Sequence, residues 1–465
     1  MQIPILNGIY TDENSDFRVS YPRNMVPVAG PQGISAGYLR PAPGITQFAT
    51  VPGVDRGGIN WNGTCYRVTG DKFISIGSDG LVDEIGTITG SDIVSFDYSF
   101  DRLAIAAGGY LYYFDGMTMT RVVDPDLGSA LDVIWVDGYF MTTDGEFLVV
   151  TDISDPTSVN PLKYGSSEAD PDPIKALLKL RNEPHAINRY TIEVFDNVGG
   201  AGFPFERIEG AQIQRGVVGT HACCLFLDSV AFLGGGRDEP VSVWVGSNGS
   251  STKIATQEID RILSGYAEYI LADVLLESKV YNGNQQLLIH LPDKTLAYDA
   301  TASQALGQPV WFTLSSSVNG HGKYRAINHV WCYGKWLVGD PLYSRAGILR
   351  DDISSHWGNP VGWEFGTTII YNEGRGAIFH EIEIVTLAGR SKIGADCTVW
   401  TDWTTDGESW SQRRSVQSGK KGDRAKRLIW LQQGNMEHWR AQRFSGTSEA
   451  HISVARLEAR IEGLQ

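Results

Sequence analysis

Short apolar strands joined by tight turns recur throughout residues 58–350, and this repeat dominates the pattern of the chain. Each copy has an apolar strand, a turn, and a second strand that often ends in an aromatic or aliphatic residue followed by Asp. The clearest copies span residues 103–115, 140–152 and 287–299. Apolar runs of this length bounded by turn residues are typical of β-strands, so the pattern predicts a series of β-hairpins.

The turns recur at intervals close to the length of a four-stranded propeller blade. The intervals are 39, 36, 43, 47, 58 and 46 residues, measured between turn centres at Gly70, Gly109, Gly145, Asn188, Gly235, Asp293 and Gly339. One such blade cannot bury both of its faces, so several must pack around an axis. The sequence therefore predicts an all-β protein built on a β-propeller of six or seven blades.

The two ends of the chain follow different patterns. Residues 1–50 hold six of the 19 prolines and show little periodicity, which predicts an extended N-terminal arm that packs on another surface. The last 100 residues show longer strands of alternating polarity, which are typical of a small β-sandwich. We expect the arm at residues 1–50, the propeller at residues 51–365 and the C-terminal β-sandwich at residues 366–465.

Composition and cysteine usage fit a globular protein without a disulfide framework. Apolar residues make up 42% of the 465 residues and charged residues 20%. The N-terminus lacks the basic and apolar regions of a signal peptide, so we expect synthesis in a cytoplasm without export or membrane insertion. The five cysteines lack any C-x-x-C spacing, which favours buried free thiols over disulfides or a zinc site.

The net charge of −15 is unevenly distributed. Residues 376–465 hold 13 Lys/Arg and 11 Asp/Glu, so residues 1–375 carry a balance of −17. An acidic surface repels nucleic acid, which argues against a protein that reads DNA sequence. A conduit through which DNA slides without binding stays compatible with this charge.

No motif predicts catalysis, a cofactor or a metal site. The nine histidines are dispersed without metal-ligand spacing, and neither a G-x-S-x-G elbow nor a phosphate-binding loop occurs. His290 lies in the middle of an apolar strand and is expected to be a hydrogen-bonded core residue. Carboxylate pairs could serve a glycosidase, but nearly all stand beside Pro or Gly, where Asp favours turns. These pairs are Asp124/Asp126, Asp170/Asp172, Asp238/Glu239 and Asp351/Asp352.

The strongest local charge signal is a segment that we name the basic segment, residues 413–427. It holds seven basic residues and a single acidic one, Asp423; the basic residues are Arg413, Arg414, Lys420, Lys421, Arg424, Lys426 and Arg427. One interpretation is a solvated loop between two sandwich strands. The other is a contact with an acidic neighbour, either another copy of this chain or a partner subunit. Aromatic residues do not interleave with these charges, so nucleic-acid stacking is disfavoured.

Seven segments resemble the packaged-DNA stabilisation proteins of short-tailed bacteriophages, also called tail hub or nozzle proteins. They run in order along nearly the whole chain, and none is a catalytic motif. The segments are YPRNMVP with SAGYLRPAPGI, RGVVGTHACCLFLDSVAFLG from Arg215, TKIATQEIDRIL, LLIHLPDKTLAYDA, GILRDDISSHWG from Gly347, and ISVARLEARIE near the end.

The resemblance implies a non-enzymatic structural protein of the virion tail that needs no cofactor. It implies a homo-hexameric ring below the portal and its adaptor protein. The ring would close the channel after packaging, retain the genome and conduct DNA during ejection. It would also carry tailspikes or fibres and a needle or plug, while double-stranded DNA passes through the lumen without sequence-specific binding. The alternative is a tail-associated propeller that binds or cleaves carbohydrate, which would require converging carboxylates in an aromatic-lined pocket.

Overall fold

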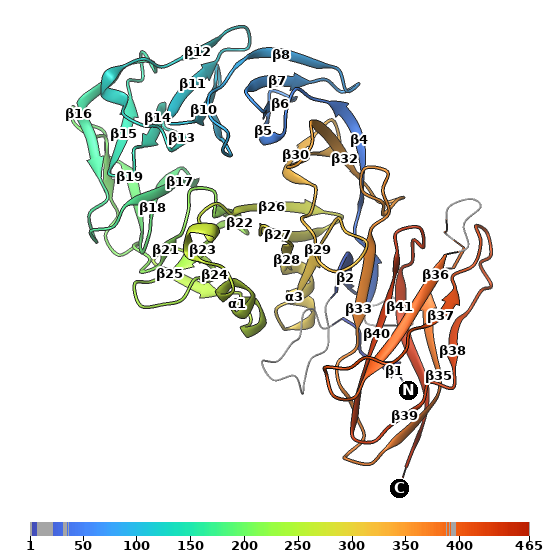
Figure 1. Cartoon of the computed structure of the whole chain (residues 1–465). Helices are drawn as coiled ribbons and strands as arrows, with labels where there is room; N and C mark the ends of the chain where they lie inside the picture. Colours follow the sequence, from blue (N-terminus) through green and yellow to red (C-terminus); the bar gives the residue numbers. More distant parts are fainter. Residues whose placement is uncertain are drawn as a thin grey trace. The chain divides into compact units, whose positions relative to one another are not determined.

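The computed structural model describes residues 2–6, 22–30, 35, 37–386, 388, 389, 391 and 397–464, and part of the predicted arm lies outside them. Strands dominate (Figure 1), and the described helices are short: α1 Gln257–Ser264, α2 Glu268–Leu271, α3 Ala300–Leu306 and the 3-10 turn η2 Pro125–Leu127. None of the described helices combines the length and apolar character that a membrane crossing requires.

The chain divides into two compact units. We name the first the propeller unit, which comprises Gln47–Ser278 and Arg325–Ile348. We name the second the sandwich unit, which comprises Met1–Thr46, Lys279–Tyr324 and Leu349–Gln465.

Seven antiparallel sheets of four or five strands follow one another along the described chain from β4 to β32. The first four contain β5 Asp55–Trp61, β6 Thr64–Thr69, β7 Lys72–Ile76 and β8 Val82–Thr87; β9 Ser95–Tyr98, β10 Leu103–Ala107, β11 Tyr110–Phe114 and β12 Met119–Arg121; β13 Asp132–Val136, β14 Tyr139–Thr143, β15 Phe147–Thr151 and β16 Val159–Ser166; β17 Ile174–Leu180, β18 Glu183–Asn188, β19 Ile192–Asn197 and β20 Phe205–Arg207.

The remaining three sheets contain β21 Gly216–Val217, β22 Cys223–Phe226, β23 Ser229–Gly235, β24 Ser242–Ser247 and β25 Ser250–Lys253; β26 Leu275–Tyr281, β27 Asn284–His290, β28 Thr295–Asp299 and β29 Trp311–Leu314; β30 Ile327–Cys332, β31 Lys335–Gly339, β32 Arg345–Arg350 and β4 Gly44–Thr50. Every turn centre expected from the sequence lies at the connection between the second and third strands of one sheet. The all-β propeller prediction is therefore confirmed, and the described chain forms seven blade-like sheets.

The seventh sheet takes its outer strand from the N-terminal part of the chain. β4 lies beside β32 although about 300 residues separate them, and Val51 N donates to Ser344 O at 3.3 Å. Ala49 packs with Ile74 and Ala346, so this strand joins the core between the first and last sheets. A strand borrowed in this way leaves neither end of the repeat as a free edge.

Aromatic side chains fill the space between neighbouring sheets of the propeller unit. The rings of Phe73 in the first sheet and Phe114 in the second lie 5.3 Å apart. Tyr113 and Phe140 join the second sheet to the third at 5.0 Å. Consecutive residues of a strand face opposite neighbours, so Phe114 packs on the first sheet and Tyr113 on the third, and both faces of the second sheet are buried.

Carboxylates on the first strands of the sheets bind the backbone of the following sheet. Asp97 accepts a hydrogen bond from Trp135 N at 2.6 Å, Asp132 from Leu177 N at 2.8 Å, and Glu277 from His329 N at 2.8 Å. We name these three contacts the inter-sheet clasps. They satisfy buried amides and fix the register of adjacent sheets.

Besides β27, β28 and β29 of the sixth blade-like sheet, the sandwich unit contains two sheets that face each other across an aromatic core. One has the order β2 Met25–Ala29, β3 Gly37–Pro41, β41 Val454–Gly463, β35 Ala377–Thr386 and β38 Leu428–Leu431, with β1 Gln2–Ile3 on β41 and β39 Asn435–Met436 on β35. The other has the order β33 Gly362–Gly366, β40 Trp439–Thr447, β36 Thr398–Thr404 and β37 Arg414–Gln417, with β34 Ile370–Tyr371 on β40. Trp430 of the first sheet lies 5.6 Å from Phe444 of the second, between ring centroids.

Several local expectations are also met. His290 is buried, and its Nδ1 lies 3.1 Å from the Thr295 hydroxyl. All five cysteines are free thiols, and all except Cys224 are buried. Burial raises the pKa of the Cys65 thiol to about 11, so this group stays protonated and unreactive at neutral pH.

Candidate interaction surface

The basic segment connects the two sheets of the sandwich. It begins at the start of β37, in one sheet, and ends just before β38, in the other. All seven of its Lys and Arg residues are exposed. Each therefore keeps its charge in contact with solvent, although the seven residues differ in what they contact.

Three of the seven are engaged within the sandwich. Arg413 lies 3.3 Å from Asp402, measured from Nε to Oδ2. Arg427 lies beside Glu383, with Nε to Oε1 at 2.9 Å. Arg414 donates to the backbone oxygens of Leu431 and Gln432. These contacts tie the ends of the segment to both sheets.

The other four cations are Lys420, Lys421, Arg424 and Lys426. Within the part of the chain that the structure describes, no carboxylate lies within ion-pair distance of any of them. Asp423, between them in sequence, uses its backbone amide to close a turn on Lys420 O at 3.0 Å. The middle of the basic segment thus presents positive charge outward, while its ends are held in place.

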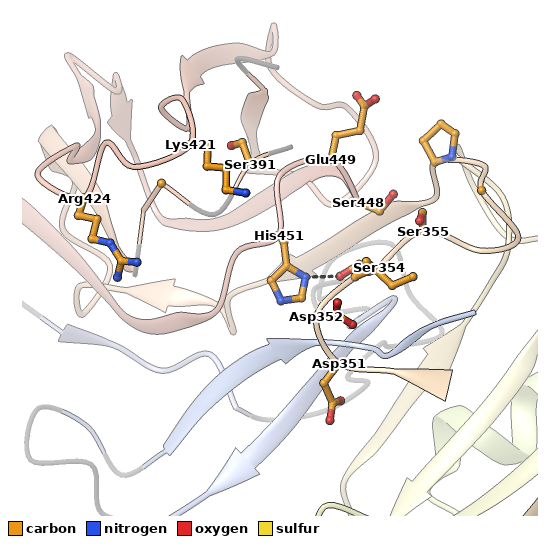
Figure 2. Close-up of a pocket in the computed structure, with 14 residues that line it drawn as sticks. Asp351, Asp352, Ser354, Ser355, Ser391, Lys421, Arg424, Ser448, Glu449 and His451 are labelled. Atoms are coloured by element: carbon orange, nitrogen blue, oxygen red, sulfur yellow. Dashed lines mark hydrogen bonds between the residues drawn. The ribbon is translucent and has the colours of Figure 1, made fainter. Parts of the chain in front are cut away.

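Lys421 and Arg424 also line a cleft of about 720 Å³ in the sandwich unit. Figure 2 shows these two cations on one side and Asp351 and Asp352 on another, with His451 between them. The Ser354 hydroxyl lies 2.6 Å from His451 Nδ1. This hydrogen bond joins the connection after β32 to the one before β41.

The carboxylates of the cleft already have partners. Tyr281 and Asn282 donate to Asp351 at 2.8 Å each. Arg350 lies beside Asp352, and its hydrogen bonds hold the pKa of that carboxyl below the ordinary value. Cations on one side and carboxylates on the other suit a polar peptide segment that carries both signs of charge.

The first of the other carboxylate pairs forms a local turn, because Asp124 accepts a hydrogen bond from Asp126 N at 2.9 Å. Asp172 instead accepts a hydrogen bond from Tyr190 N, 18 residues away, at 2.6 Å. That bond joins the loop before β17 to the turn between β18 and β19.

A smaller cavity of about 290 Å³ lies among the first strands of four sheets in the propeller unit. Its lining includes Asp97, Asp132, Lys179 and His221. Burial raises the pKa of Asp132 to about 6 and lowers that of His221 to about 4. Asp97 and Lys179 form an ion pair at 3.6 Å, so the cavity is polar and one of its two carboxylates has a cationic partner.

The cleft residues Asp351, Ser354, Glu449 and His451 were not singled out in the sequence as a site. About 100 residues separate the two segments that supply them. Only the pairing of distant strands brings them together, so local spacing carries no signal for the cleft. The basic segment, in contrast, is visible as a run of charge, although its division into tethered and outward-facing cations is not.

Two family models cover nearly the whole chain. The model described as bacteriophage P22 Gp10, beta-propeller, matches residues 1–354, and the model described as bacteriophage P22 Gp10, beta-sandwich, matches residues 362–462. The chain therefore belongs to the bacteriophage P22 Gp10 family. A curated relative is the tail hub protein gp10 of Salmonella phage P22, which is 27% identical over 486 aligned residues that cover 99% of each chain. The family resemblance expected from the sequence is thus confirmed.

Solved structures that align with the chain do so at low similarity. The Pan2 WD40 domain of Neurospora crassa aligns with 66% of this chain and 94% of its own length, at 11% identity and a TM-score of 0.41. The N-terminal domain of Nup159 aligns with 74% of this chain and 98% of its own length, at 9% identity and a TM-score of 0.39. Similarity at this level carries no argument about function.

Proposed function

We propose that this chain is a structural tail hub protein of a short-tailed phage, located in the virion below the portal. The observation that carries the proposal is the match to a tail hub protein over 99% of both chains, through propeller and sandwich alike. The chain acts as a building block rather than as an enzyme.

In this role six copies form a ring that closes the portal channel after packaging, retains the genome and later conducts it out. The charge of the chain supports such a conduit, because residues 1–375 carry a balance of −17. DNA phosphates gain little from a wall of the same sign, so the DNA slides without sequence-specific binding.

The ring contacts a portal adaptor protein on one side and a needle or plug on the other, and carries tailspikes or fibres. The basic segment is a contact surface in this assembly. Its four outward-facing cations support this assignment, because in the described sandwich they have no carboxylate partner.

Cryo-electron microscopy of intact particles tests the proposal. We expect this chain to occupy a sixfold ring around the DNA path, below the portal adaptor. Particles assembled without the chain are expected to package DNA and then lose it. Intact particles that lack the chain at the head–tail junction, or hold it only as a peripheral appendage, would refute the hub assignment.

A further inference from the structure

The turns at one edge of the propeller unit form a distinctive surface, which we name the turn rim. In an antiparallel sheet, the turn between the first and second strands lies at the same end as the turn between the third and fourth. In the first four sheets these turns include residues 62–63, 77–81, 99–102, 115–118, 137–138, 152–158, 181–182 and 198–204. Figure 1 shows these sheets following one another around the unit.

Contacts between sheets confirm that the turns share one edge. Trp61 Nε1 lies 3.4 Å from Ser99 O, at the first turn of the next sheet. Asp137 accepts hydrogen bonds from Asn182 at 2.6 Å and from Asn197 at 3.1 Å, both in the sheet that follows its own. Phe100, in the first turn of the second sheet, lies 5.5 Å from Trp135 of the third sheet between ring centroids, so the turn rim is continuous across the four sheets.

The turn rim is acidic. Six exposed aspartates lie in or directly beside its turns: Asp79, Asp101, Asp115, Asp137, Asp155 and Asp196. Each carboxylate accepts hydrogen bonds nearby; Asp115, for example, accepts from Met117 N at 2.8 Å and Thr118 N at 2.7 Å. Hydrogen bonds within the turns lower the pKa values of Asp115 and Asp155, so both are ionised at neutral pH.

Few cations offset this charge. Arg102 pairs with Asp101 at 2.8 Å, and Lys163 pairs with Asp152 at 2.9 Å. Arg181 is also exposed at this edge. Negative charge therefore prevails on the turn rim, and hydrogen bonding holds it in fixed positions.

Apolar side chains project from the same turns. Phe100 is 91% exposed and Met117 is 88% exposed. Leu81, Ile153 and Val198 are each more than half exposed. Large apolar residues gathered along one edge mark an interaction surface, and the acidic surroundings indicate a partner with positive charge and aliphatic side chains.

We propose that the turn rim docks the basic segment of a neighbouring copy of this chain, an inference that rests on the proposed ring. Charge complementarity carries it: Lys420, Lys421, Arg424 and Lys426 are exposed and have no carboxylate within ion-pair distance in the described sandwich, and the turn rim presents fixed carboxylates. The aliphatic stems of the Lys side chains cover the apolar tips, and Arg424 can stack on the Phe100 ring. Because rim and segment are different surfaces, the contact is head-to-tail, which is the kind of contact that forms a ring when the rotation between neighbouring copies closes.

Charge-swapped variants of the full-length chain test this contact. The rim variant is Leu81→Lys/Met117→Lys/Val198→Lys, which adds positive charge without removing any of the turn aspartates. The segment variant is Lys420→Glu/Lys421→Glu/Lys426→Glu. The rim variant places three cations among the turn aspartates, and the segment variant places three carboxylates opposite them. Each variant alone therefore removes the charge complementarity of the contact, and we expect its self-association in sedimentation velocity to weaken at least tenfold.

An equimolar mixture of the two variants is the decisive measurement. Each contact in an alternating ring then joins opposite charges, so we expect association of the mixture to return to within about threefold of the original chain. The matched control is Val123→Lys/Tyr269→Lys, which alters two exposed residues away from the turns of the rim and is expected to associate normally. Circular dichroism and melting temperature establish that each variant is folded.

Two results would overturn the inference. One is unchanged association of either folded variant. The other is weakened association that the mixture does not restore, as when the turn rim receives a different protein. Neither result affects the hub proposal, which stands if the original chain occupies the ring in particles and falls if it does not.

Discussion

At the scale of single residues, the inter-sheet clasps add hydrogen bonds between neighbouring sheets to the apolar packing of the propeller. Asp97 receives a backbone amide from the next sheet and also pairs with Lys179. Asp132 receives amides from both Val133 and Leu177. These side chains contribute to stability through buried hydrogen bonds rather than through apolar contact, so their effects depend on charge state.

Removal of the Asp97 carboxylate is expected to destabilise the chain. Asp97→Ala leaves Trp135 N without its acceptor and Lys179 without its ion-pair partner. We expect the free energy of unfolding to fall by about 2 kcal/mol, as is typical when a buried donor loses its partner. Urea unfolding at neutral pH measures the change. Asp101→Ala, which removes an exposed carboxylate, is the control and should alter stability by less than about 0.5 kcal/mol.

Asp132 predicts a pH dependence of stability. Its pKa is raised by burial from 3.8 to about 6, so the unfolded chain ionises first as pH rises. Its contribution to stability is therefore complete below pH 4 and is lost between about pH 4 and 6. Asp132→Asn does not titrate, so the wild-type chain should lose about 2 to 3 kcal/mol relative to this variant across that window. Urea unfolding of both proteins at pH 4 and pH 7 tests this, and a difference of the opposite sign would contradict it.

At the scale of elements, the hairpin repeat could be predicted because strand alternation and turn residues are local signals. Gly70, Gly109 and Gly145 mark turns whose strands pair within a few residues of them. The partners of the N-terminal strands β1 and β4 could not be predicted, because these strands pair with segments far away in the sequence. β4 pairs with β32, and β1 pairs with β41. The cleft at His451 could not be predicted from the sequence for the same reason, because its residues come from connections that are far apart in the chain.

The outer strand β4 predicts a second change in stability. Ala49 is buried against Ile74 and Ala346, so Ala49→Asp places a charge in an apolar interface without a partner. We expect a loss of about 3 kcal/mol or more in the free energy of unfolding. Gln47→Asp, at an exposed position of the same strand, should change stability by less than about 0.5 kcal/mol. Equal melting temperatures for the two variants would show that β4 contributes little to the propeller.

At the scale of the whole molecule, charge is divided between two parts of the sequence. The acidic balance of residues 1–375 and the near-neutral C-terminal part with its basic segment could be read from the sequence. The positions of the acids could not, because Asp79, Asp115 and Asp155 gather on one edge only when their sheets pack side by side. Folding thus converts a diffuse acidic composition into a defined surface.

The same charge distribution predicts how the chain meets DNA. At 0.15 M salt the full-length chain should bind double-stranded DNA more weakly than about 10 µM, because few phosphates can be neutralised by a surface with a balance of −17 over residues 1–375. Electrophoretic mobility shift with a long duplex measures this.

Lowering the salt to about 0.05 M reveals any contribution of the basic segment, since phosphate contacts strengthen steeply as salt falls. The segment variant, Lys420→Glu/Lys421→Glu/Lys426→Glu, should abolish that residual binding. Micromolar or tighter binding at 0.15 M salt would contradict a conduit that DNA passes without being held by its wall, and would place the basic segment on the DNA rather than on a neighbouring subunit.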